Sequence, residues 1–286
     1  MIRLFRCAAI SLTTIAMFMT VNATAYQLQI SSSGDTVRWE ESCFYYTLHE
    51  DGSDDVPMDA LREAIRASFD TWENVPCSYF YFEETEEDAT CSPIGFDLEK
   101  SNMNLIVWRE SNWRLDKNDR DHGHSVMALT TLSYDDNTGR ILDADIEFNG
   151  EDFEFSASGE PGKADIQNTA THEIGHTIGL EHTNNPATTM YYSAETGTTN
   201  KRSLHDDDID GICYLYPLED DPQICKEPYC GLDQHCEGST CETGDGIETN
   251  PATMTEPTTG CSISDVGRKN ARWFEMFSTF ILTFAR

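Results

Sequence analysis

The segment 172–176 (His-Glu-Ile-Gly-His) carries two imidazoles and one carboxylate at a spacing that suits metal chemistry. Residues four apart share one face of a helix, so His172 and His176 can present two nitrogens to a single ion. Zn²⁺ favours nitrogen ligands, and a catalytic zinc site keeps one position open for water. Glu173 follows the first ligand, where its carboxylate can reach that water. The pattern predicts a zinc site with Glu173 as general base.

A third histidine completes the pattern. Gly179 can adopt the positive φ that ends a helix, so the chain can turn back and deliver His182 as the third ligand. The full five-residue pattern is expected by chance in roughly one chain in 10⁵ from average residue frequencies. A distant Glu ligand, the arrangement of another class of zinc peptidase, is therefore unnecessary. The chemistry this indicates is hydrolysis by a zinc-activated water.

Periodicity predicts the elements that position these residues. Apolar residues at helical spacing predict helices between Pro57 and Asn74 and over 165–179, and a capping box at 203–206 opens a third helix that runs to about Tyr214. β-prone and alternating segments predict strands at 43–48, 104–108, 126–134 and 141–148. The domain is therefore expected to be α+β.

The charge balance excludes several classes of partner. Acidic residues number 51 and basic residues 19, giving a formal net charge of −32. Such a chain repels nucleic acid and anionic lipid, so we expect no nucleic-acid partner. Separately, we expect a monomeric protein that acts on protein or peptide substrates. Acidic loops also suit Ca²⁺, which we keep as a second cofactor to test beside zinc.

Met190 lies eight residues beyond His182, and together with the zinc pattern it resembles the metzincin signature and its Met-turn. Thr183 after the third histidine, and the stretch 204–216, resemble the matrixin branch over roughly residues 35–217. This resemblance implies a twisted, mostly parallel five-stranded sheet with an antiparallel edge strand, an active-site helix and a C-terminal helix. It implies a secreted zinc endopeptidase.

The same resemblance implies roles for further residues. Met190 would form a hydrophobic base beneath the zinc, and Asp207 and Asp208 would hydrogen-bond around the Met-turn. At position 192 the chain departs from the matrixin pattern, because Tyr192 replaces the usual Pro two residues after the Met. Astacins and serralysins carry a Tyr there, so Tyr192 would either donate a hydrogen bond to the oxyanion or form a wall of the specificity pocket. The strand 141–148 would edge the cleft and bind substrate as an added strand.

The sequence departs from the matrixin pattern in two further ways. Matrixins bind a second, structural zinc with a histidine on this strand, and Asp145 stands about where that histidine is expected. We therefore assign no structural zinc site. His122 and His124 could bind a metal, but we interpret them as members of a flexible polar loop. Too few residues precede the first strand for an inhibitory propeptide, so we expect no cysteine-switch latency.

The chain divides into five predicted parts. Residues 1–25 read as a signal peptide with a small-x-small cleavage site, so that the mature chain begins at Tyr26 and is exported. The catalytic domain is expected over 35–218, a Cys-rich module over 222–245 and a Thr/Pro-rich linker over 246–260. Residues 261–286 resemble a bacterial sorting tail, which would attach the protein to a membrane or cell surface.

Ten cysteines in an exported chain predict disulfides. We expect Cys77 to pair with Cys91, and Cys43 with Cys213. Four cysteines of the predicted module would form two disulfides or, with His235, a second zinc site: Cys225, Cys230, Cys236 and Cys241. Cys261 is then left over.

A different class of function also fits a protease fold. The alternative is a binding or adhesion protein at the cell surface that has lost turnover, with the Cys-rich module contacting a partner. Because the base and all three predicted ligands are present in the sequence, we favour the peptidase.

Overall fold

The computed structural model describes residues 26–97, 102–114 and 122–225, together with the backbone of 275–284. The predicted signal peptide, most of the Cys-rich module and the Thr/Pro-rich linker lie outside these residues. In the part of the chain that the structure describes, no helix is long and apolar enough to cross a membrane.

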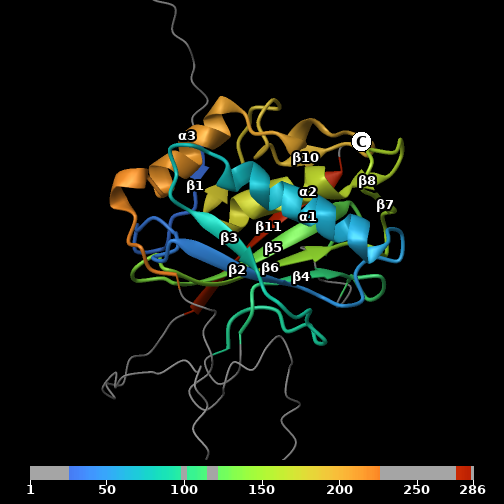
Figure 1. The fold of residues 1–286 in the computed structure, drawn as a ribbon, viewed down its shortest axis with the longest axis horizontal. Coiled ribbons are helices and arrows are strands. Elements are labelled where there is room, and N and C mark those ends of the chain that lie inside the picture. Colours follow the sequence, from blue (N-terminus) through green and yellow to red (C-terminus); the bar gives the residue numbers. More distant parts are fainter. Residues whose placement is uncertain (1–25, 98–101, 115–121, 226–274, 285–286) are drawn as a thin grey trace, which may run out of the picture.

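One mixed sheet forms the centre of the domain, with strand order β10-β11-β5-β6-β4-β2-β3 (Figure 1). Four neighbouring strands are parallel: β3 (Tyr81–Glu84), β2 (Cys43–Leu48), β4 (Leu105–Trp108) and β6 (Ile141–Phe148). The fifth strand, β5 (Val126–Asp135), runs antiparallel to β6. These five strands confirm the mostly parallel five-stranded sheet with one antiparallel strand.

Two strands extend the sheet beyond β5. These are β11 (Glu275–Phe284), which pairs antiparallel with β5, and the short β10 (Ser193–Ala194), which pairs parallel with β11. Two-stranded pairs form elsewhere, between β1 (Gln27–Leu28) and β9 (Leu180–Glu181), and between β7 (Phe155–Ser156) and β8 (Ala164–Asp165).

The three predicted helices are present: α1 (Met58–Glu73), α2 (Ile166–Thr177) and α3 (Asp206–Leu215). Helices α1 and α2 lie on the same side of the sheet (Figure 1). The buried face of α1 carries Leu61, Ile65, Phe69 and Trp72, the residues that predicted it. The Trp72 indole donates to the carbonyl of Thr171 over 2.8 Å, so α1 also fixes the position of α2.

Two details of the expected elements are wrong. The strand β6 is not an edge strand of the five-stranded sheet but lies between β4 and β5. The chain leaves β5, turns at 135–139 and returns as β6 beside it. The N-cap of helix α3 lies two residues later than the first residue of the predicted capping box at 203–206. Its N-cap is His205, whose ring accepts from the N–H of Asp207, while Asp208 accepts from the N–H of His205.

Both expected disulfides of the catalytic domain are also wrong. Cys77 pairs with Cys213, and Cys43 pairs with Cys225. The loop after α1 lies against the end of α3, since the N–H of Leu218 donates to the carbonyl of Cys77. Cys91 is disulfide-bonded too, with a partner other than these four cysteines.

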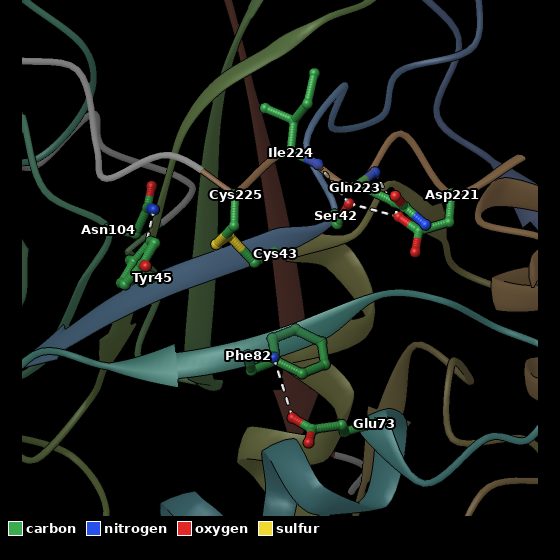
Figure 2. Close-up of a disulfide and its surroundings, with 10 residues drawn as sticks. All are labelled: Ser42, Cys43, Tyr45, Glu73, Phe82, Asn104, Asp221, Gln223, Ile224 and Cys225. Carbon is green, nitrogen blue, oxygen red and sulfur yellow. Dashed lines mark hydrogen bonds between the residues drawn. A yellow bond between two sulfur atoms is a disulfide. The ribbon is translucent and has the colours of Figure 1, made fainter.

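Segment 221–225 is bound to the start of β2 around the second disulfide (Figure 2). Ser42 donates its N–H to the carbonyl of Ile224 over 2.6 Å and its hydroxyl to Asp221 over 2.7 Å. Cys225 therefore belongs to the catalytic domain and does not pair within the predicted module. The other three cysteines of that module lie outside the described residues.

A buried pair of carboxyls lies on β6, in place of the histidine ligand discussed above. Asp145 accepts hydrogen bonds from the N–H groups of Gly95 and Leu105, over 2.6 and 2.9 Å. Asp143, 1 % exposed, adjoins Asp145, and its Oδ2 has no hydrogen-bond partner. Burial raises the pKa of Asp145 to about 7, and burial together with the Asp145 charge raises the pKa of Asp143.

We predict that Asp143→Asn stabilises the protein at pH 8 by about 2 kcal/mol and much less at pH 5. The folded carboxyl pair keeps a proton that the unfolded chain has already lost. The free energy of unfolding of the native protein therefore falls as pH rises from about 4 toward 7. Asn at position 143 cannot ionise beside Asp145. Thermal unfolding across pH 5–8 measures the effect.

Glu63→Gln is the matched control, since it removes one negative charge from the exposed side of α1. It should leave the pH dependence unchanged. An Asp143→Asn protein with the pH profile of the native chain would contradict the prediction.

Candidate metal centre

Helix α2 is fixed at both ends. At its start, the N-cap Asp165 accepts from the N–H of Asn168 over 2.9 Å and binds the guanidinium of Arg202. At its end, the Trp39 indole donates to the carbonyl of Thr177 and the Tyr216 hydroxyl to that of Ile178, each over 2.8 Å. These bonds satisfy carbonyls that a helix terminus leaves without partners.

The turn after α2 requires glycine. Gly179 has φ +98°, and a Cβ there would overlap the carbonyl oxygen of Val37. The chain then reverses into β9, which pairs with β1 and ends next to His182. The structure thus confirms the helix stop predicted at Gly179 and brings His182 back to face α2.

The three histidines converge on one point. The Nε2 of His182 lies 3.1 Å from the Nε2 of His172 and 3.2 Å from that of His176. Within the described residues, they are the only group of three or more His, Cys, Asp or Glu residues that brings ligand atoms together to hold a metal ion.

The outer ring nitrogens determine what the inner ones can do. The Nδ1 of His172 lies 2.6 Å from the carbonyl of Thr189, and the Nδ1 of His176 lies 2.7 Å from that of Leu180. A carbonyl only accepts, so each Nδ1 carries the proton and each Nε2 presents a lone pair. Lone pairs about 3 Å apart repel, and a cation between them removes the repulsion.

The electrostatics also suit a cation bound to neutral imidazoles. Burial and neighbouring positive groups lower the pKa of His172 and His176 well below the usual value, and burial lowers that of His182 to about 4. Three neutral nitrogen donors that leave a coordination position open are the ligand set of a catalytic zinc. The residues present therefore fit Zn²⁺.

Glu173 lies beside this centre and is fully buried. The Thr130 hydroxyl on β5 donates to its Oε2 over 2.6 Å, while Oε1 has no hydrogen-bond partner. Burial raises the pKa of Glu173 to about 8. A divalent cation nearby favours the ionised carboxylate instead. Oε1 is thus a buried acceptor available to a water or a reacting group.

Met190 packs against α2, and its role as a base beneath the zinc stays a prediction. It is 1 % exposed, and a Cβ at Gly175 would overlap its sulfur, so glycine permits the contact. Asp208 holds this turn: its carboxylate accepts from the N–H groups of Thr189 and Met190 over 2.8 and 3.1 Å. The carbonyl of Thr189 in turn accepts from His172.

The structure separates the two predicted aspartates. Asp208 contacts the Met-turn, whereas Asp207 is close to the N–H of Tyr26. Tyr192 is 45 % exposed, with its ring centroid 6.4 Å from that of His182. Both roles considered for Tyr192, oxyanion donor and pocket wall, stay predictions.

Lys201 was missed by the sequence reasoning. It is 2 % exposed, and its Nζ donates to the carbonyl of Tyr191 and lies 3.2 Å from the Nδ1 of His172. Burial lowers its pKa to about 7. A lysine in a polar segment reads as exposed, and no sequence signal distinguishes this one.

The remaining histidines considered from sequence lie elsewhere. The Nε2 of His122 lies 3.5 Å from Glu147, which also accepts from Arg109 over 2.6 Å. Although burial opposes it, the hydrogen bond from His122 and the Arg109 charge lower the pKa of Glu147. His124 contacts Asp152 over 2.8 Å. These two histidines therefore contact carboxylates and do not join the three converging histidines.

Comparison with known proteins gives a consistent result. A family model described as Peptidase_M10, Matrixin, matches residues 38–217. Matrilysin of Mus musculus is 32 % identical over 118 residues, which cover 40 % of this chain and 44 % of that protein. Neutrophil collagenase of Homo sapiens is 31 % identical over 135 residues, which cover 45 % and 28 %.

A longer alignment joins the chain to matrix metalloproteinase-16 of Rattus norvegicus, 25 % identical over 179 residues that cover 63 % of this chain and 27 % of that protein. The chain thus spans less than half the length of the curated relatives it matches.

We predict that Asp208→Asn lowers zinc affinity roughly tenfold and the free energy of unfolding by about 2 kcal/mol. The amide places a donor against a backbone N–H, so Thr189 loses its support and with it the acceptor of His172. Titration against a chelator and thermal unfolding measure the two effects. Asp206→Asn, an exposed aspartate on the same helix turn, is the control. Equal zinc affinity in the two variants would refute the link to His172.

Proposed function

The chain belongs to the matrixin family of zinc metallopeptidases, and on that premise we propose that it is a secreted endopeptidase with Glu173 as general base and His172, His176 and His182 as zinc ligands. The single observation that carries this proposal is the convergence of three histidine ring nitrogens beside the Oε1 of Glu173, which has no hydrogen-bond partner. A binding protein without turnover has no need of that oxygen.

The proposed mechanism assigns each proton to an atom. Zinc at the three imidazoles supplies Lewis acidity, which acidifies water and polarises a carbonyl. Glu173 accepts the proton of the attacking water at Oε1 and passes it to the leaving amine. Thr130 keeps Oε2 occupied, so the proton is exchanged at the other oxygen. The proton acceptor is then fixed before substrate binds.

The proposed path of the substrate follows β5 rather than β6. β5 carries Thr130 and therefore passes directly beside Glu173, whereas β6 is separated from α2's catalytic turn by β5. An extended peptide that adds a strand to β5 gains main-chain hydrogen bonds along its length. The substrate class proposed is an extended segment of a protein or peptide.

Export and the mature N-terminus are part of the proposal. The disulfides support an oxidising compartment. The N–H of Tyr26 is close to the carboxylate of Asp207, and the Tyr26 ring packs on Tyr214, with centroids 5.8 Å apart. Signal-peptide removal before Tyr26 would place an ammonium group at Asp207. Surface attachment through 261–286, a monomeric state and Ca²⁺ binding stay predictions from sequence.

Hydrolysis of a mixed peptide library by the 26–259 chain, with metal analysis and a chelator control, tests the proposal. This chain keeps the Cys43–Cys225 disulfide. About one zinc per chain, with cleavage lost to the chelator, is the expected result. Bound zinc without cleavage would favour the binding-protein alternative, and a chain that binds no zinc would overturn the proposal.

We predict that Glu173→Gln lowers kcat/KM by roughly 10²–10⁴-fold while zinc stays bound. The amide keeps the shape of the side chain but accepts no proton from water. Metal analysis and peptide hydrolysis are measured on one preparation. Glu195→Gln, which changes an exposed glutamate directly after β10, should keep native activity. Unchanged turnover in Glu173→Gln would remove Glu173 from the mechanism, and loss of zinc would make it a ligand.

A further inference from the structure

The last described segment of the chain lies beside the proposed active site. Strand β11 pairs antiparallel with β5 from Glu275 opposite Asp135 to Thr283 opposite Val126. Its far end pairs parallel with β10, with Ser193 opposite Thr283. The strand, red in Figure 1, therefore runs between β5 and β10, against α2.

The register of this strand aligns it with the catalytic residues. Phe280 pairs with Thr130, the residue whose hydroxyl holds Glu173. The backbone around Phe280 therefore passes the general base at the place where the mechanism needs an extended peptide. On the other side, β10 follows Met190 by three residues and flanks the same path.

The composition of the segment suits this pairing. Residues 275–284 read Glu-Met-Phe-Ser-Thr-Phe-Ile-Leu-Thr-Phe, with one charge in a mostly apolar and β-prone stretch. In a chain with a net charge of −32, this is a segment of low charge that can add to an open sheet edge.

The tether makes the pairing intramolecular. Residues 226–274 join β11 to Cys225, which the disulfide fixes on β2. A chain of that length can extend over roughly 160 Å, so it can reach any part of the domain. A tethered segment competes at an effective concentration that a free substrate must exceed.

We propose that strand β11 occupies the peptide-binding groove of its own catalytic domain and keeps the peptidase latent until the tail is withdrawn or removed. This inference rests on the proposed function. It gives the chain a means of control that differs from a cysteine-switch propeptide, and it assigns to the groove an occupant of known sequence.

The test compares four proteins that begin at Tyr26. They are the chain to Arg286, a chain that stops at Thr259, the full chain with Phe280→Pro and Ile281→Pro, and the full chain with Thr258→Pro and Thr259→Pro. Two successive prolines remove N–H groups from both sides of β11. The linker prolines introduce the same residue type outside the strand.

We expect kcat/KM to rise by roughly tenfold or more in the truncated and strand-proline proteins, because a groove open in a tenth of the molecules costs that factor. The linker-proline protein should behave as the full chain does. A synthetic peptide of residues 275–284 with added lysines should inhibit the truncated protein by raising KM. Equal kcat/KM in the full and truncated chains would overturn the proposal.

Hydrogen exchange separates this proposal from the peptidase assignment. Measured in a Glu173→Gln background, where the tail cannot be cut, the amides of β5 should exchange faster in the truncated and strand-proline chains than in the full chain. If the truncated chain cleaves nothing, the proposed function fails. Hydrogen exchange then still shows whether β11 occupies the edge of β5. Equal exchange of β5 in all four proteins refutes the groove occupancy.

Discussion

Three converging imidazole nitrogens are the constraint on which this structure depends: the Nε2 lone pairs of His172 and His176 lie 3.1 and 3.2 Å from the Nε2 of His182. The lone pairs point inward because the carbonyls of Thr189 and Leu180 take the protons on the other ring nitrogens. The first carbonyl is held by Asp208 through the Met-turn, and the second follows the positive-φ turn at Gly179. The Met-turn and the turn after α2 therefore hold the histidines in an arrangement that is unfavourable until a cation binds between them.

Much of the site could be predicted because its residues are local in sequence. The spacing of His172 and His176 follows from one helix turn, and Gly179 can be recognised as a stop by its place after the last helical residue. Strand and helix positions followed from periodicity, and the bounds of β2 and β6 agree with the prediction. Met190 was identified through the family resemblance, since a buried methionine alone carries no such signal.

The features that sequence reasoning missed depend on contacts between distant segments. Cys77 meets Cys213 because the loop after α1 packs on the end of α3, across 136 residues. The contact of Lys201 with His172 and the placement of β5 rather than β6 beside Glu173 have the same origin. Each follows from strand order and helix packing, which local spacing does not determine.

A peptidase that binds its substrate as an added strand must keep one sheet edge open beside its general base. An open edge offers unpaired N–H and C=O groups to any extended chain, including one from another copy. The net charge of −32 opposes such pairing between molecules. It acts weakly on a tethered segment with a single charge. The same main-chain hydrogen bonds that select an extended substrate therefore favour binding of the tail of the same chain. One strand pairing would then both cover the open edge of the sheet and block access of substrate.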